Sequence, residues 1–195
     1  MPKHEITRAD ILPLDKYAAE RRSLRQTVVA LKERRRMEVG PFATFFFESY
    51  QTMWHQVHEM LYIEKGGEAQ IADELSAYNP LIPKGRELVA TVMLEIEDPV
   101  QRARTLARLG GIETKMFVSI GGEQIRGRPE GDLERTKADG KTSSVHFVHF
   151  PFSDAQAAAF KKPDTQVIVG VDHPNYAHMA VMSPVVKQAL AEDFD

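Results

Sequence analysis

The segment 41–64, PFATFFFESYQTMWHQVHEMLYIE, constrains the fold most, because it concentrates aromatic side chains in one stretch of the chain. Most of its apolar residues recur at the three- and four-residue spacing of a helix. Pro41 is also a favourable first helical residue. We therefore predict one long helix over 41–64, with a broad apolar face that includes Phe46 and Trp54 and lies in the core.

A second long helix is predicted before it, over 16–37, with Asp15 as its N-cap and Gly40 as the break. Segment 16–36 is strongly basic. Its eight cationic and two acidic residues give a local charge of +6. The net charge of the chain is −3, so the rest of the chain carries −9. An acidic body with a basic helix can bind anions or pair with a second copy. We expect a homo-oligomer, and we take the arginine run as an anion-binding candidate: Arg34, Arg35 and Arg36.

The remaining pattern predicts an α+β fold. A short helix over 68–77 leads into the connector YNPLIPKG at 78–85, after which strands alternate with helices. We expect an N-terminal helical segment, 1–80, of two long helices plus one short. It packs on a mostly antiparallel sheet with two or three helices in an α+β segment, 81–195, and the two form one compact unit. Expected strands are 88–96, 115–120, 123–126, 145–152 and 166–171, and expected helices are 98–109, 153–161 and 183–192.

The polar segment 128–144 is predicted to be a loop, either a lid or an insertion. The chain has no cysteine, which excludes disulfides, thiolate nucleophiles and cysteine-ligated metal centres. It has no uninterrupted apolar run long enough to span a membrane, and its N-terminus does not resemble a signal peptide. We expect a cytoplasmic protein with no membrane association.

One polar stripe on the helix predicted over 41–64 has metal-ligand character. His55 and Glu59 are one helical turn apart, and Glu48 lies further back on the same side. Iron or zinc would suit these ligands. The stripe is incomplete without ligands from other elements, so a solvated or hydrogen-bonded face is the alternative. His173 lies in a turn after a predicted strand, and His146 lies on the strand 145–152, facing away from His149.

Several short motifs together resemble a bacterial family catalogued as domain of unknown function 3501. The resemblance spans nearly the whole chain, and its most distinctive piece is the connector. The motifs are Arg34-Arg35-Arg36 before Val39-Gly40, Phe47-Glu48, Glu59-Met60-Leu61, Asp73-Glu74-Leu75, Tyr78-Asn79-Pro80-Leu81-Ile82-Pro83, Val145-His146-Phe147 and Asp172-His173-Pro174.

The resemblance implies a cytoplasmic bacterial protein in a redox or stress context, because the genes of that family tend to lie near rubrerythrin-like and iron–sulfur oxidoreductase genes. It implies no established activity. Glu48, Glu59, His146 and His173 match the family's pattern, whereas His55 does not, so the first four are favoured for any shared site.

Three hypotheses for function remain open at this point. The first is a binding or accessory protein of a bacterial redox or stress pathway, with a redox protein as a partner. The second is a metal-dependent enzyme or sensor with histidine and carboxylate ligands. The third is a nucleic-acid-binding regulator that uses the basic helix 16–36, which ranks last because the segment lacks a helix-turn-helix signal and aromatic residues for base stacking.

Overall fold

The structure is a computed structural model that describes residues 3–131 and 140–195. Within these residues the chain forms six α-helices and nine β-strands. The helices are α1 (Leu14–Glu33), α2 (Tyr50–Glu64), α3 (Glu68–Tyr78), α4 (Pro99–Leu106), α5 (Asp154–Lys161) and α6 (Pro184–Ala191). The strands are β1 (Arg36–Val39), β2 (Ala43–Phe47), β3 (Glu87–Leu94), β4 (Met116–Ile120), β5 (Glu123–Arg126), β6 (Arg128–Pro129), β7 (Val145–Pro151), β8 (Val167–His173) and β9 (Tyr176–Val181).

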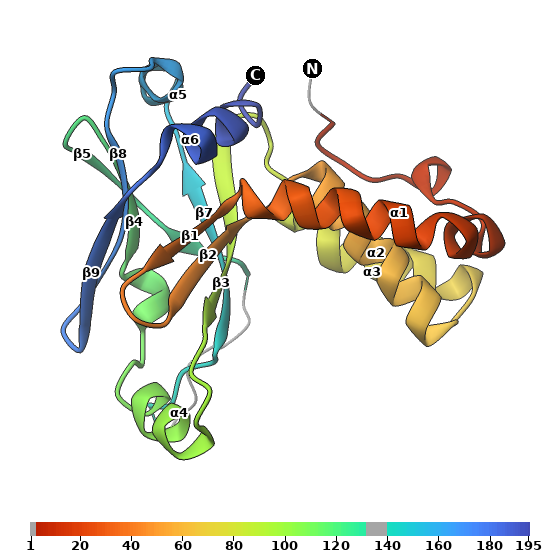
Figure 1. Cartoon of the computed structure of the whole chain (residues 1–195), viewed down its shortest axis with the longest axis horizontal. Coiled ribbons are helices and arrows are strands. Elements are labelled where there is room, and N and C mark those ends of the chain that lie inside the picture. The colour runs from red at the N-terminus through yellow and green to blue at the C-terminus, as the bar shows by residue number, and fades with distance from the viewer. Residues whose placement is uncertain (1–2, 132–139) are drawn as a thin grey trace.

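The strands form two antiparallel sheets, so the predicted α+β class is confirmed. The five-stranded sheet has the order β1-β2-β3-β7-β6, and the four-stranded sheet has the order β5-β4-β8-β9. We expected one sheet rather than two. The difference arises because β4, β5, β8 and β9 pair only with one another and lie over the other sheet as a second layer (Figure 1).

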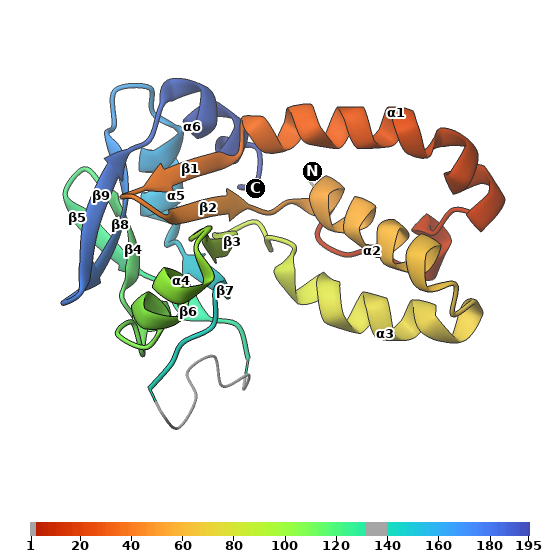
Figure 2. The ribbon, with the colours of Figure 1, turned by 60° about the horizontal axis from the view of Figure 1, so that its bottom comes forward.

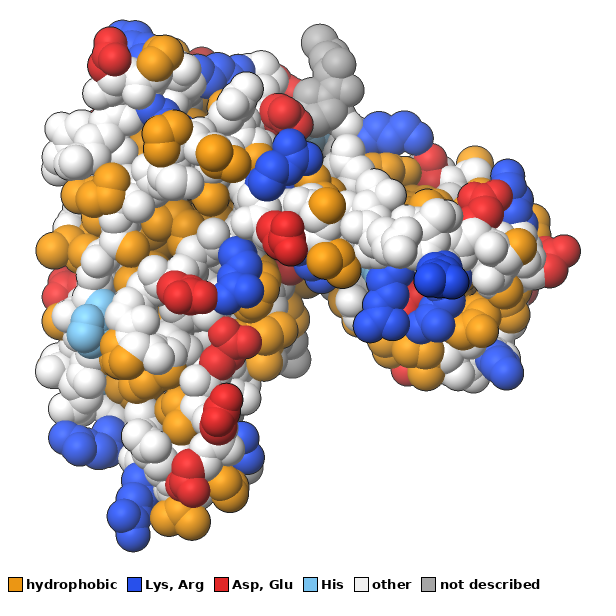
Figure 3. Space-filling model, in the orientation of Figure 1, with side chains coloured by type: hydrophobic (Ala, Val, Ile, Leu, Met, Phe, Trp, Pro, Cys, Tyr) orange, Lys and Arg blue, Asp and Glu red, His pale blue; other side chains and the backbone are white. Residues whose placement is uncertain are grey.

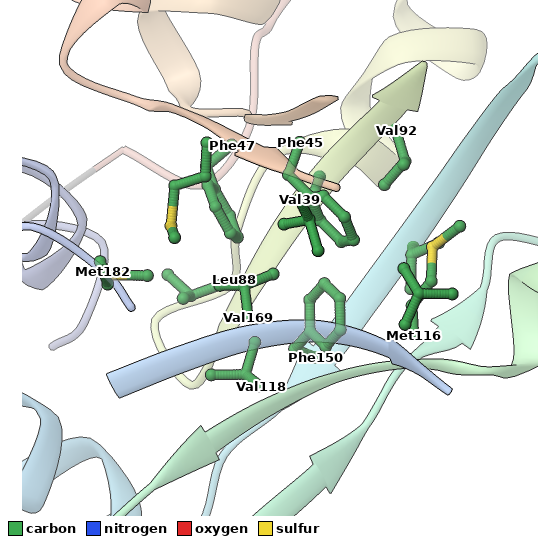
Figure 4. Close-up of a cluster of buried hydrophobic side chains, with 14 of the residues drawn as sticks. Val39, Phe45, Phe47, Leu88, Val92, Met116, Val118, Phe150, Val169 and Met182 are labelled. Atoms are coloured by element: carbon green, nitrogen blue, oxygen red, sulfur yellow. The ribbon is translucent and has the colours of Figure 1, made fainter. Parts of the chain in front are cut away.

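The main core lies between the two sheets. Alternate residues of each strand point into it, as the two-residue period of a strand requires. On β3, for example, Leu88 and Val92 are fully buried in this core, to which the other sheet contributes Val118 and Val169 (Figure 4). Burying this many large apolar side chains is the main stabilising contribution to the body of the molecule.

The three N-terminal helices form an arm that projects from the body of the two sheets (Figures 1 and 2). A second, smaller core joins this arm to the outer face of the five-stranded sheet. Met53 and Val57 of α2 pack there with Val89 of β3. None of the helices that the structure describes is both long and apolar enough to cross a membrane.

The helix predicted over 41–64 is wrong in its first part. Residues 43–47 form β2, which pairs with β1 and β3, and the helix begins only at Tyr50. Phe45 and Phe47 are buried between the sheets, whereas Phe46 points to the other side and is only half-buried. Four phenylalanines in six residues fit a helical face and an alternating strand equally well, so periodicity did not discriminate between them.

The true start of α2 has its own signal at Ser49. The Ser49 hydroxyl accepts a hydrogen bond from the backbone N–H of Thr52, and the Thr52 hydroxyl accepts one from the N–H of Ser49. This reciprocal pair satisfies two backbone donors at the helix terminus. The helix predicted over 16–37 is wrong at its C-terminal end. The helix α1 ends at Glu33, and residues 36–39 form β1.

Three other expectations differ from the structure. The expected helical segment 1–80 is interrupted by the β1–β2 hairpin, which belongs to the five-stranded sheet. Strand β9 was not predicted at all. The expected loop 128–144 begins with β6, which pairs with β7, and its central part, 132–139, lies outside the described residues.

Candidate functional site

A charged cluster holds α1 and α2 together in the helical arm. The buried Tyr17 hydroxyl donates a hydrogen bond of 2.6 Å to Glu59, and Arg21 donates two bonds of 2.8 Å to the two oxygens of the same carboxylate. The hydrogen bonds from Arg21, helped by Tyr17, lower the pKa of Glu59 to about 2. Burial, with Glu59 nearby, raises the pKa of Tyr17. Glu59 is therefore ionised at neutral pH, where its hydrogen bonds hold α1 against α2.

This cluster makes arm stability depend on acid pH. A carboxylate with a lowered folded-state pKa stabilises the protein above its unfolded pKa, and that contribution disappears as the pH falls through the folded value. We expect Glu59→Gln to lower the free energy of unfolding by about 2–3 kcal/mol at neutral pH. The difference from wild type should shrink between pH values of about 4.5 and 2 in urea titrations.

Glu68→Gln is the matched control for this prediction. Glu68 also accepts two hydrogen bonds from an arginine, Arg8, but this pair is largely exposed. Water and salt screen such pairs, so the control should change stability much less. Equal effects of the two variants at neutral pH would show that the Glu59 cluster is not the joint between α1 and α2.

An open groove of about 560 Å³ runs along the arm beside this cluster. Arginines line it together with small apolar side chains, and Tyr62 of α2 forms part of its wall. Its lining residues are Ala18, Arg21, Arg22, Arg25, Gln26, Val29, Ala30, Glu33 and Tyr62. Lys and Arg side chains gather on this part of the arm in Figure 3.

The arginines of the groove have different roles. Arg21 is engaged by Glu59 and lies over the Tyr62 ring, with 4.7 Å between the guanidinium carbon and the ring centroid. Arg22 and Arg25 are exposed, and within 3–131 and 140–195 neither forms an ion pair. Val29 is 52% exposed next to them. The groove thus presents two uncommitted cations beside an apolar surface.

His55, one of the metal candidates, lies between α1 and α2 and is 9% exposed. Its Nε2 atom is buried and has no hydrogen-bond partner among the described residues. Burial lowers the pKa of His55, and the nearby Glu59 carboxylate only partly opposes this effect. The imidazole is therefore neutral near pH 7.

Glu48 lies in the junction between β2 and α2, away from Glu59. Its two carboxylate oxygens accept hydrogen bonds from the hydroxyls of Thr52 (2.6 Å) and Thr91 (2.7 Å). Glu48 thus links the first turn of α2 to the outer face of β3. It serves as a buried joint between the arm and the sheet.

His146 and His173 lie on the other side of the five-stranded sheet. His146 of β7 points between the sheets, and its Nε2 atom lies 2.8 Å from the carbonyl of Ser143. His173 ends β8. Its Nε2 donates to the carbonyl of Gly110, and its Nδ1 accepts from the N–H of Asn175.

The sheet therefore separates the five metal candidates instead of bringing them together. Glu48, His55 and Glu59 face the arm side, and His146 and His173 face the inter-sheet side. In the part of the chain that the structure describes, no three His, Asp or Glu residues are placed to hold a metal ion. Iron or zinc binding stays a prediction.

The three arginines of the anion-binding candidate also have different surroundings. Arg34 is exposed at the end of α1, and Arg36 forms a 2.5 Å ion pair with Glu38. Arg35 is 3% exposed and donates hydrogen bonds to backbone carbonyls of Phe47, Glu48 and Ala189 and to the carboxylate of Asp193. Anion binding by this run stays a prediction, and only Arg34 presents an exposed, unpaired charge for it among the described residues.

Comparison with known proteins places the chain in a family. A family model described as "Protein of unknown function (DUF3501)" matches residues 5–194. The chain belongs to the DUF3501 family. No curated protein matches it. Among solved structures it is similar to a crystal structure described as a novel protein of unknown function from Burkholderia pseudomallei K96243. The two share 40% identity over 97% of this chain and 99% of that chain, with a TM-score of 0.90.

One polar cluster of this DUF3501 protein was not predicted. On β7, His149 lies between two carboxylates, with Nδ1 2.9 Å from Glu87 and Nε2 against Glu130. Burial alone would lower the pKa of His149, but the two carboxylates more than offset it, so the pKa is raised. The sequence placed His149 opposite to His146, which is confirmed. Its partners come from β3 and from the end of β6, so only the strand pairing brings them together.

Proposed function

We propose that this DUF3501 protein is a binding protein whose helical arm docks an acidic partner protein, in the redox or stress context that the family resemblance implies. The observation that carries the proposal is the groove of α1 and α2, in which Arg22 and Arg25 are exposed beside Val29. Arginines with adjacent apolar surface are typical of protein interfaces. Complementary charge is what would select an acidic partner.

The chemistry of the groove supports binding over catalysis. Guanidinium groups stay protonated at physiological pH, so they attract and orient anions but do not exchange protons with a substrate. Glu59, which accepts hydrogen bonds from the groove residue Arg21, is held as an anion by Arg21 and Tyr17. The groove therefore has the groups to hold an acidic surface, and its basic character explains the uneven charge of the chain.

The test uses a labelled helical peptide with glutamates on one face and leucines beside them, titrated with the full chain. We expect its fluorescence anisotropy to show binding that weakens with salt, as exposed charge pairs do. The double variant Arg22→Glu/Arg25→Glu should weaken binding at least about tenfold. Arg102→Glu/Arg104→Glu, which reverses two exposed arginines of α4, is the matched control and should bind like wild type.

Three results would overturn the proposal. One is equal binding by both double variants, which would mean that net charge and not the groove attracts the peptide. Another is no binding of the acidic peptide by wild type at low salt. The third is binding of a single-stranded or duplex nucleic acid probe in preference to the peptide, which would favour the nucleic-acid hypothesis instead.

A further inference from the structure

Strand β9 is an open edge of the four-stranded sheet. It pairs with β8 on one side only. Met182 N donates to Val167 O, so the even-numbered residues before it, such as Ala180, also direct their backbone groups at β8. The backbone groups of Ala177, Met179 and Val181 therefore point away from β8. Throughout 3–131 and 140–195 no group hydrogen-bonds to them.

The same strand carries exposed apolar side chains. Met179 is 68% exposed and Val181 is 61% exposed, and Val185 at the start of α6 is 58% exposed. These are three of the eight large hydrophobic side chains that the described residues expose, so more than a third of them lie within seven residues. Hydrophobic side chains gather over β9 and the start of α6 in Figure 3.

The edge also lacks protecting charges. Between Asp172 and Lys187 the chain has no Asp, Glu, Lys or Arg. Solvated edge strands normally carry a charge, a proline or a bulge that prevents pairing with another chain. Here the one proline of the turn, Pro174, precedes the strand, and β9 pairs regularly with β8 from Tyr176 to Val181. Among the described residues, the outer edge of β9 therefore has none of these three protecting features, although the β1–β2 hairpin lies against the strand at Tyr176 and His178.

We propose that a second copy of this chain pairs with β9, antiparallel and about a two-fold axis that passes between Met179 and Met179 of the partner subunit. In this register Met179 lies opposite Met179 of the partner subunit, and Ala177 lies opposite Val181 of the partner subunit. The three residues whose backbone groups point outward then exchange hydrogen bonds with the same three residues of the partner. The two four-stranded sheets become one continuous sheet across the dimer.

Charge and pattern both favour a second copy over a strand from another protein. A two-fold axis places the residues next to it near their own copies, so a charge close to the axis would meet a like charge. The uncharged stretch 173–186 avoids this repulsion. The same stretch has no charged side chain that could attract a partner of opposite charge. The groove of the arm has such side chains, Arg22 and Arg25. The two surfaces lie on different parts of the molecule, so the dimer does not depend on the proposed docking function.

Sedimentation velocity of the full chain over the micromolar range tests the dimer. Wild type should show a concentration-dependent dimer, and Met179→Lys and Met179→Glu should each be monomeric because like charges meet at the axis. An equimolar mixture of these two variants should dimerise again, because lysine then faces glutamate. Val100→Lys adds a charge to a comparably exposed valine of α4, and it should dimerise like wild type.

Thermal melting by circular dichroism checks that each variant is folded, which the 68% exposure of Met179 favours, and Met179→Arg or Met179→Asp replaces a variant that is not, because each keeps its charge at the axis. Three outcomes overturn the proposal. They are a wild type that stays monomeric, a folded Met179→Lys that dimerises as well as Val100→Lys, and a variant mixture that stays monomeric. The last outcome would exclude pairing about Met179 even if β9 contributes to another interface.

Discussion

Replacing Arg35 by methionine is expected to lower the free energy of unfolding by about 3–5 kcal/mol, the usual effect of breaking a buried ion pair from one side. Methionine fills similar space but donates no hydrogen bonds. Asp193 would then be a buried carboxylate without its counter-charge, and carbonyl groups of Phe47, Glu48 and Ala189 would lose their donor. Urea denaturation followed by circular dichroism measures the loss.

Arg36→Met is the matched control for this variant. Arg36 is the next residue, but it is exposed and pairs with Glu38 on the surface, so its loss should change stability by less than about 1 kcal/mol. The double variant Arg35→Met/Asp193→Leu removes both buried charges and should recover much of the stability. If Arg35→Met and Arg36→Met were equally stable, the buried contacts of Arg35 would not contribute to the stability of the fold.

The Arg35 variant should also respond to pH. Burial raises the pKa of Asp193 to about 6, and Arg35 opposes this rise only in part. When a carboxylate has a higher pKa in the folded state than in the unfolded state, the folded state binds the proton first. The free energy of unfolding therefore rises as the pH falls from above 6 towards the unfolded-state pKa. The loss caused by Arg35→Met should therefore be smaller at pH 5 than at pH 8, because Asp193 then takes up a proton.

Phe47→Ala is expected to lower the free energy of unfolding by about 3–5 kcal/mol, as do other large-to-small substitutions in a packed core. Phe47 is 1% exposed, and its ring lies 6.3 Å from that of Phe45 between the two sheets. The adjacent Phe46 lies on the opposite face of β2, half-buried, with Arg36 over its ring. Phe46→Ala should cost less than about 1.5 kcal/mol.

The comparison of these two alanine variants discriminates strand from helix directly. A helix over 41–64 would bury Phe46 on its apolar face, and Phe46→Ala would then be strongly destabilising. Strand β2 buries Phe45 and Phe47 instead. Chemical denaturation of both variants under the same conditions decides the matter, and a larger loss for Phe46→Ala would contradict the β1–β2 hairpin.

Local signals predicted most of the second half of the chain. Asp98, Ser153 and Ser183 were expected to begin helices, and each side chain accepts a hydrogen bond from a backbone N–H in the first turn. The expected strands 115–120 and 123–126 are β4 and β5, and only Gly121-Gly122 separates them, with positive φ angles that suit a tight turn. These features depend on neighbouring residues only, so the sequence is sufficient to reveal them.

The strands that were missed depend on distant partners. β2 is apolar enough for either a helix or a strand, and pairing with β3, more than forty residues later, decides between them. β9 has the sequence Tyr-Ala-His-Met-Ala-Val, whose alanines and histidine give only a weak strand preference. Its pairing with β8 is what holds it extended.

The candidate site was only partly predictable for the same reason. Helical spacing placed His55 and Glu59 on one polar stripe, and a hydrogen-bonded face was one expected role for that stripe. The spacing could not show that Arg21 and Tyr17 occupy the Glu59 carboxylate, because this depends on how α1 packs against α2. The groove itself depends on the same packing, since its wall combines α1 residues with Tyr62.

The link from Arg35 to α6 also bears on the order of events during synthesis. Arg35 contacts Ala189 and Asp193, which leave the ribosome more than 150 residues later. Domains that rely on such distant contacts fold slowly, because a long loop must close before the contact contributes. The base of the helical arm therefore cannot be completed until segment 184–193 has emerged from the ribosome.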